Sequence, residues 1–230
     1  MEEAVRIISA TVPFIKDENG RSMSTNEYVA YVARISNPKN QSNHATGAKL
    51  LKSLLRDKHW SPLEMVDVTI EINTTRDIAR QILRHRSFSF QEFSQRYAAV
   101  TEMSDPREAR LQDTKNRQSS IEIDHYDDAQ EELARKWIAA QDEVIITAQE
   151  VYKWALEKGI AKEVARSVLP EGLTMSRLYM KGSLRSWIHY CQLRIDNGTQ
   201  KEHMLIASEC WYLLNQEYEF LRGILDAGDN

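Results

Sequence analysis

The chain has 230 residues and a mass of 26.7 kDa, enough for one large domain or two small ones with a full hydrophobic core. Hydrophobic residues make up 42% and charged residues 28%, a composition typical of a folded protein and not of a disordered one. Thirty Lys and Arg residues against thirty-four Asp and Glu residues give a net charge of −4, which argues against a general nucleic-acid-binding protein.

Several further classes are excluded by what the sequence lacks. No apolar run approaches the roughly 18 residues that span a membrane, and the acidic start is unlike a secretory signal, so we expect a cytoplasmic protein that does not contact membranes. Cys191 and Cys210 cannot form a disulfide framework, which fits a reducing compartment. Glycine-rich phosphate loops, His-Glu-x-x-His and Gly-x-Ser-x-Gly are all missing, and we expect no metal site.

The first third of the chain predicts strands and helices in alternation. Residues 5–14 are β-branched and predict a strand, and residues 25–36 and 46–58 predict helices. Residues 63–73 alternate with period two, which predicts a strand with one apolar face and one face left for solvent or ligand. Asn73-Thr74-Thr75 then predicts the cap of a helix that runs to about Arg84.

The middle of the chain is less regular. Residues 86–100 predict a loop followed by a short strand, and residues 101–120 predict a polar loop with a break at Asp105-Pro106. Residues 126–158 carry an apolar stripe at helical spacing and predict one long helix that Gly159 ends.

The last part predicts a strand and two helices. Residues 173–180 predict a strand, residues 183–195 a helix, and residues 199–221 a final amphipathic helix. With no repeats and no linker, the simplest expectation is one mixed α+β domain over residues 1–230, with a central antiparallel sheet flanked by long helices.

An arginine cluster stands out in this acidic chain. Residues 76–96 contain no lysine, but hold Arg76, Arg80, Arg84, Arg86 and Arg96. Arginine binds phosphate or carboxylate through two parallel bonds, and the segment after Arg86 adds hydroxyl, amide and aromatic groups that suit a planar polar ligand such as a nucleotide. The alternative is a basic helix end that compensates the helix dipole, followed by a surface loop.

The order of these residues is specific. Arg84-His85-Arg86, then Ser89 and Glu92, then Ser94, Arg96 and Tyr97, resembles the motif of the flavin-dependent thymidylate synthases, the ThyX family. Further similarities to the family cover most of the chain: Ser61-Pro62-Leu63-Glu64, Ala79-Arg80-Gln81, residues 165–170 with Arg166, residues 184–194 with Arg185, His189 and Arg194, and Gln200-Lys201-Glu202.

This resemblance implies an enzyme that makes thymidylate from deoxyuridylate (dUMP) in a homotetramer with active sites between subunits. Methylenetetrahydrofolate would supply the carbon, NADPH the hydride, and bound FAD the redox chemistry. The resemblance implies these dUMP-binding residues: Gln81, Arg84, Glu92, Phe93, Ser94, Gln95, Arg96, Arg166 and Arg194. It implies these FAD-binding residues: Ser36, Arg84, His85, Arg86, Glu92, Ser183, Arg185 and His189.

The family resemblance assigns the catalytic role to Arg194, which would favour the ionised uracil ring, and requires no cysteine nucleophile. A guanidinium keeps its proton while it stabilises such a charge. Arg185 and Arg194 lie on opposite sides of the predicted helix, which a site shared between chains would accommodate. The alternative for Arg194 is a surface salt bridge, and we expect both cysteines in the core.

Three positions differ from the family pattern. Met65 stands where many members have a histidine, Asp67 where a small hydroxyl residue is frequent, and Ser183 where asparagine is usual. We therefore expect a working site with altered flavin contacts. Two other hypotheses are a noncatalytic nucleotide- or RNA-binding module that uses the arginine-rich aromatic loop, and a structural oligomer with a degenerate site.

Overall fold

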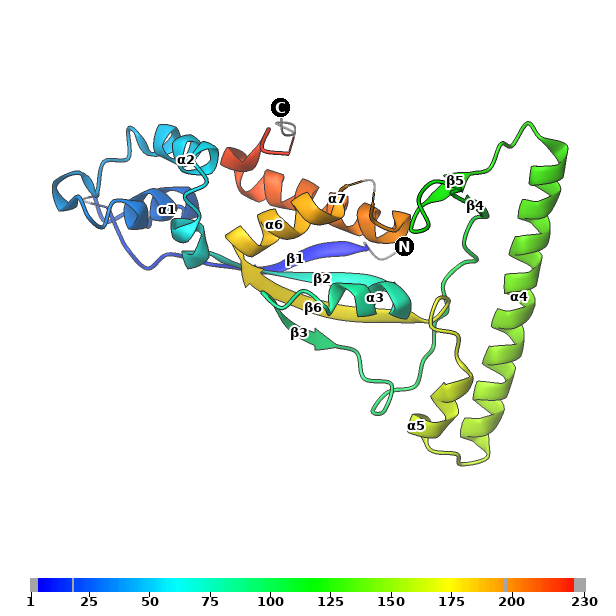
Figure 1. The fold of residues 1–230 in the computed structure, drawn as a ribbon. Coiled ribbons are helices and arrows are strands. Elements are labelled where there is room, and N and C mark those ends of the chain that lie inside the picture. Colours follow the sequence, from blue (N-terminus) through cyan, green and yellow to red (C-terminus); the bar gives the residue numbers. More distant parts are fainter. Residues whose placement is uncertain (1–3, 18, 197, 226–230) are drawn as a thin grey trace.

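A four-stranded antiparallel sheet forms the centre of the molecule in the computed structural model, which describes residues 4–17, 19–196 and 198–225 (Figure 1). The strand order is β1-β2-β6-β3. The bounds are β1 (Val5–Ala10), β2 (Asp67–Thr75), β6 (Met175–Ser183) and β3 (Ser89–Glu92). The arginine-rich motif, residues 84–97, contains the edge strand β3. Because β6 pairs with both β2 and β3, it fixes this motif against the sheet.

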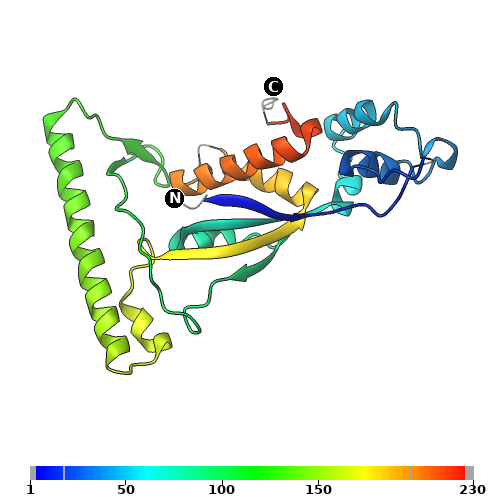
Figure 2. The same cartoon turned by 180° about the vertical axis from the view of Figure 1, so that it is seen from behind.

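Helices cover one face of this sheet, as Figures 1 and 2 show from opposite sides. These helices are α3 (Arg76–Ile82), α6 (Leu184–Arg194) and α7 (Lys201–Glu217). The predicted apolar face of β2 lies beneath them, and Val66, Val68, Ile70 and Ile72 are fully buried. Trp187 of α6 joins the two layers, since its indole N–H donates to the Val68 carbonyl at 3.1 Å.

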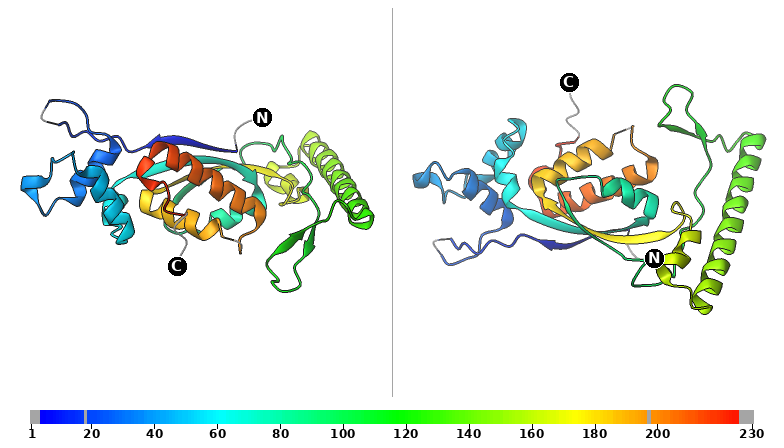
Figure 3. Two further views of the ribbon diagram at one scale, coloured as in Figure 1. Left: turned by 90° about the horizontal axis from the view of Figure 1, so that it is seen from above. Right: turned by 60° about the horizontal axis from the view of Figure 1, so that its bottom comes forward.

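Two further parts extend from opposite ends of the sheet (Figure 3). One end carries α1 (Thr25–Ala33), the 3₁₀ turn η1 (Pro38–Asn40), α2 (Gly47–Arg56) and η2 (Ser61–Met65). The other end carries the hairpin β4 (Arg110–Gln112) and β5 (Ser120–Glu122), α4 (Asp128–Glu157), α5 (Lys162–Ala165) and η3 (Arg166–Val168). A last turn, η4 (Glu219–Leu221), follows α7.

The α+β class and the antiparallel sheet are confirmed, and the long helix ends as predicted, with Gly159 just beyond it at φ +80°. Several boundaries were wrong. The first strand ends at Ala10 and not at residue 14, and the second begins at Asp67 after a 3₁₀ turn and continues to Thr75. Asn73-Thr74-Thr75 belongs to the strand, because it pairs with β6. Thr75 stands at the predicted N-cap position of α3, but its hydroxyl donates to Asp77 and makes no capping hydrogen bond.

The middle of the chain was predicted least well. In residues 86–100 the strand precedes the loop, and the predicted loop 101–120 contributes to the hairpin β4–β5. Both elements are short and are stabilised by pairing partners distant in the sequence or by a local turn, so neither has a strong pattern of its own. The strand predicted at 173–180 is confirmed and extends to Ser183, and both cysteines are fully buried as expected. Among the helices of the described ranges, none combines the length and apolar character of a membrane-spanning segment.

Candidate functional site

Phe88 anchors the arginine-rich motif to the core. Its ring is buried and contacts Trp187 edge to face, with ring centroids 4.9 Å apart. Gly182 makes this packing possible, because a Cβ at that position would lie 2.4 Å from Cδ1 of Phe88. The chain then enters β3, whose pairing with β6 fixes the direction of every residue from Ser89 to Glu92. The motif is therefore placed by sheet pairing and one aromatic anchor, and not by a helix.

A first group of candidate residues, which we call the Arg194 cluster, lies where α3, α6 and α7 meet. It consists of Gln81, His85, Tyr190, Arg194 and His203. Arg194 Nε donates to His85 Nε2 at 3.0 Å, Gln81 Oε1 lies 3.3 Å from His203 Nδ1, and Tyr190 Oη lies 3.1 Å from His203 Nε2. The structure thus brings the predicted catalytic arginine, one predicted dUMP residue and one predicted FAD residue close together.

The two histidines of the Arg194 cluster are held neutral. Burial, reinforced by the charge of Arg194, lowers the pKa of His85 to about 4. Burial also lowers the pKa of His203 to about 4, with smaller contributions from Arg194 and His85. A neutral His85 can accept the Arg194 hydrogen bond through an unprotonated Nε2. The Arg194 guanidinium therefore lies beside an imidazole ring that carries no charge.

A second group, the Glu64 cluster, lies at the start of α6. Ser183 caps this helix, since its hydroxyl accepts from the Ser186 amide at 3.2 Å, and it donates to Glu64 Oε2 at 2.5 Å. Arg185 Nη1 lies 2.9 Å from Glu64 Oε1, and the ring of His189 meets Trp60 edge to face at 4.9 Å. Burial and the nearby Arg185 lower the pKa of His189, against an opposing effect of Glu64. Three predicted FAD residues, Ser183, Arg185 and His189, thus lie close together in the first turns of α6.

A third group, the Glu163 cluster, lies at the other end of the sheet beside α5. Arg96 Nε lies 3.2 Å from Glu163 Oε2, and Arg166 Nε donates to the Glu163 carbonyl at 3.4 Å. This brings two predicted dUMP residues together from positions far apart in the sequence. Figures 1 and 2 place α5 near α4, at the end of the sheet opposite the start of α6. Within one chain, the Glu163 cluster and the Glu64 cluster are therefore separate.

The remaining motif residues of β3 and the following turn lie between these groups. Glu92 accepts from the Ser176 hydroxyl at 2.9 Å and lies 3.7 Å from Arg76. The Phe93 amide donates to the Arg177 carbonyl at 2.8 Å, so sheet pairing already uses it. Ser94 is partly exposed, whereas Gln95 is buried and its Nε2 has no hydrogen-bond partner among the described residues. A buried amide without a partner suits a site that a polar ligand completes.

Three predicted residues stay apart from these groups. Arg84 and Arg86 are exposed and have no carboxylate partner in the part of the chain that the structure describes, and Ser36 lies exposed in the turn after α1. Two arginines of the cluster at residues 76–96 are partly neutralised, because Arg76 lies 3.7 Å from Glu92 and Arg80 pairs with Glu171. Unlike Arg76 and Arg80, Arg84 is therefore available to bind an anion.

The structure adds residues that the sequence alone did not single out as parts of the site. Glu64 contacts both Ser183 and Arg185. The contact between His203 and Tyr190 joins α7 to α6, and Trp60 packs against His189. For Glu64 a signal existed, since an acidic residue directly before an apolar strand face needs a partner there. For Tyr190 and His203 no local pattern could reveal that they meet across two helices.

Known proteins resemble this chain over most of its length. Residues 21–218 match the family model described as thymidylate synthase complementing protein. The chain is 45% identical over 223 residues to a probable flavin-dependent thymidylate synthase of Paramecium bursaria Chlorella virus 1, covering 97% of this chain and 99% of the relative. It is 53% identical over 204 residues to a flavin-dependent thymidylate synthase of Synechocystis, covering 88% and 90%. The chain belongs to the flavin-dependent thymidylate synthases.

A solved structure supports the fold of this flavin-dependent thymidylate synthase family member. The chain resembles a UMP/dUMP methylase, PolB from Streptomyces cacaoi, with a TM-score of 0.73 over 94% of this chain and 93% of that one, at 23% identity. The family model and the two relatives confirm the resemblance seen in the motif at Arg84 to Tyr97, and with it the expectation of an enzyme. The hypotheses of a noncatalytic binding module and of a degenerate oligomer lose their basis.

Proposed function

We propose that this enzyme converts dUMP to dTMP with methylenetetrahydrofolate as carbon donor and NADPH as reductant, through bound FAD and without a cysteine nucleophile. The observation that carries the proposal is the contact between Arg194 and a neutral His85 inside the Arg194 cluster. It presents a fixed positive charge, within a partly buried site, to any ligand that enters. Cys191 is fully buried, and burial raises the pKa of its thiol well above the ordinary value. It is therefore unsuited to attack a substrate.

The residues present fit FAD. The start of α6 places Ser183, Arg185 and His189 close together, a set of hydroxyl, guanidinium and imidazole groups that suits a diphosphate. Arg84 and Arg86 are exposed and have no carboxylate partner among the described residues, so they can add charge-assisted bonds. Ser36 and Glu92 complete the proposed set. When bound, the flavin supplies the redox chemistry that the protein side chains cannot.

On the uracil side, Arg194 stabilises the negative charge that develops on the ring. A guanidinium keeps its proton while it stabilises such a charge. His85 holds the Nε edge of Arg194, and we assign the Nη groups of Arg194 to the ligand. Gln81, which donates to Gln200 at 2.7 Å and meets His203, is fixed in position for an amide contact with the base.

The phosphate side is assigned to Arg84, Ser94, Arg96 and Arg166, with Glu92, Gln95 and the backbone near Phe93 orienting the nucleotide. Arg96 and Arg166 are only loosely held by Glu163, and Arg96 is well exposed, so a dianionic phosphate can displace this contact. Surface ion pairs of this kind contribute at most about 1 kcal/mol. Charge-assisted bonds to phosphate contribute about 1.5–3 kcal/mol each.

The site needs more than one chain. Because the Glu163 cluster and the Glu64 cluster lie at opposite ends of one sheet, we infer a homotetramer in which different subunits supply them (Figure 1). The helix α4 supports this, since Trp137 and Trp154 are 47% and 54% exposed and several aliphatic side chains beside them are also exposed. Apolar area of this extent on one helix is typical of an interface.

Self-association can be tested on α4 directly. Trp154→Glu is expected to lower the molecular mass measured by sedimentation from that of a tetramer to that of a smaller species. Lys153→Glu, on the exposed neighbouring residue, is the matched control and should leave the mass unchanged. A wild-type protein that sediments as a monomer would rule out the shared site.

The positions that differ from the family pattern alter the flavin contacts but leave the site functional. Ser183 replaces asparagine and still caps α6, while Met65 is half exposed and offers no hydrogen bond. Asp67 forms an ion pair with Lys181, with Nζ 2.9 Å from Oδ2. We further propose a cytoplasmic setting, which suits the two free, buried cysteines.

The function is tested with purified protein, NADPH, methylenetetrahydrofolate and dUMP labelled with tritium at C5. We expect a yellow protein that releases tritium and forms dTMP. Arg194→Ala should lower the rate at least about a hundredfold, as removal of a group that stabilises transition-state charge does. Leu193→Ala, an exposed neighbour on the same helix, should not change it. A protein that binds no flavin even with dUMP present would contradict the proposal.

A further inference from the structure

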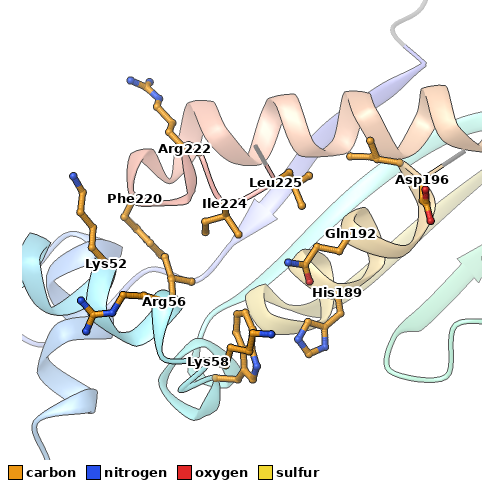
Figure 4. A pocket seen from close by; sticks show the side chains of 14 residues that line it. Lys52, Arg56, Lys58, His189, Gln192, Asp196, Phe220, Arg222, Ile224 and Leu225 are labelled. Atoms are coloured by element: carbon orange, nitrogen blue, oxygen red, sulfur yellow. The ribbon is translucent and has the colours of Figure 1, made fainter. Parts of the chain in front are cut away.

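A pocket of about 1100 Å³ lies between α2, α6 and the segment after α7, and it borders the Glu64 cluster described above (Figure 4). Leu55, Phe220 and Ile224 give it an apolar lining. Trp60 and His189 also line it, so the pocket adjoins the proposed flavin site through a side chain that both share. Its volume is sufficient for a ligand the size of a nucleotide.

The opening of this pocket is basic. Among the described residues that line the pocket, one carries a carboxylate, Asp196, and four carry cationic side chains: Lys52, Arg56, Lys58 and Arg222. Figure 4 shows Lys52 and Arg56 extending from α2, and Arg222 from the segment that follows α7. Arg56 is engaged by Asp57 at 2.8 Å, and Arg222 lies 3.7 Å from Glu219. Lys52 and Lys58 have no carboxylate partner among the described residues.

The backbone of Lys58 has an unusual conformation. Lys58 follows α2 in the left-handed conformation, with φ +55°. Among the described residues other than glycine, it is the one with a positive φ. Its amide donates to the Leu55 carbonyl and that of His59 donates to the Leu54 carbonyl, the hydrogen-bond pattern of a helix end that favours glycine. The sequence therefore keeps a strained lysine where glycine would be more stable, at the edge of the basic pocket.

We propose that this pocket binds the adenosine 2′-phosphate end of NADPH. The inference rests on the proposed function and names the place of one of its substrates. The apolar lining suits the adenine ring, and the lysines that lack carboxylate partners suit phosphate. NADPH carries one phosphate more than NADH or FAD, which matches the excess of cations over carboxylates here. Its position beside His189 places the reductant next to the residues assigned to the flavin.

The test uses direct binding of adenosine 2′,5′-bisphosphate to the purified flavoprotein by calorimetry, which does not depend on turnover. Lys58→Gly should weaken this binding about tenfold while leaving the melting temperature equal or higher, because glycine relieves the strained backbone. Lys52→Ala should weaken it several-fold. Lys49→Ala is the control, since Lys49 lies on the same helix but does not line this pocket. The KM for NADPH should rise in parallel, with little change for NADH.

Four outcomes would overturn the inference: no binding of the bisphosphate to the wild-type protein, equal binding by Lys58→Gly and wild type, equal loss for adenosine 5′-diphosphate and the bisphosphate, or loss of FAD from the lysine variants. The last two would assign the pocket to a diphosphate or to the flavin itself. Failure of the proposed function appears separately, as absence of dTMP formation in a protein whose bisphosphate binding is intact.

Discussion

Arg194 donates its Nε–H to Nε2 of His85 at 3.0 Å, which joins the last residue of α6 to the turn after α3. Both partners come from motifs of the family, but they are distant in the sequence. The contact requires a neutral imidazole, and burial supplies that by lowering the pKa of His85 to about 4. The charge that the proposed chemistry needs is thereby kept on Arg194 alone.

The stability of the protein should therefore depend on pH. In the unfolded chain His85 and His203 bind protons near pH 6.5, whereas in the folded chain they do so only near pH 4. The unfolded state binds more protons between these values, so the free energy of unfolding falls as pH decreases from about 6.5 to about 4. Each histidine contributes at most about 1.4 kcal/mol per pH unit to this slope.

Urea denaturation at several pH values between 4.5 and 7 measures this slope. His203→Gln, which removes the fully buried ring, should flatten it, although the variant is less stable at pH 7. His125→Gln, at an exposed position, is the control and should leave the slope as it is in the wild type. A wild-type stability that is constant over this range would show that these histidines are not held neutral.

Gly182 should tolerate no side chain. Gly182→Ala places a Cβ 2.4 Å from the buried Phe88 ring, so the ring or β6 must move. We expect a loss of about 1–3 kcal/mol in the free energy of unfolding, accompanied by weaker dUMP binding, because Phe88 anchors the motif. Gly198→Ala is a matched control, since a Cβ there meets nothing within 4 Å. Equal stability of the two variants would disprove the role given to this close approach.

Ser183 should have both a structural and a ligand-binding role. Ser183→Ala removes the cap of α6 and the bond to Glu64, and we expect a loss of about 1 kcal/mol in stability together with faster loss of FAD on dilution. Ser183→Asn restores a capping side chain, so it should recover the stability. If neither substitution alters FAD retention, the Glu64 cluster does not hold the flavin.

The cysteines should be dispensable for the reaction. Cys191→Ala leaves a small cavity in the core, and we expect about 1 kcal/mol lower stability but a dTMP-forming rate per folded molecule within about twofold of wild type. Cys210→Ala should behave in the same way, as it is equally buried. Loss of turnover in a folded Cys191→Ala protein would mean that the thiol takes part in the chemistry.

The sequence predicted the architecture well where periodicity was strong. The alternating valines and isoleucines of β2 are buried as expected, and the long α4 ends one residue from its predicted terminus. It failed at β3 and at the hairpin β4–β5, because short strands are defined by their partners and not by their own residues. The motif identified the candidate residues individually. It could not show that Arg194 contacts His85, or that Arg96 and Arg166 both contact Glu163 at another place, because those contacts depend on how the helices pack.

The account depends most on a site assembled from different chains, and complementation tests it most directly. Arg185→Ala and Arg166→Ala change residues of the Glu64 cluster and the Glu163 cluster, which the account assigns to different subunits, and each variant alone should be inactive. Co-expressed with different tags and purified through both, the mixed tetramers should regain roughly a quarter of wild-type activity, because some sites then combine the intact arginine of each chain. Mixed assemblies as inactive as either variant would contradict the shared site.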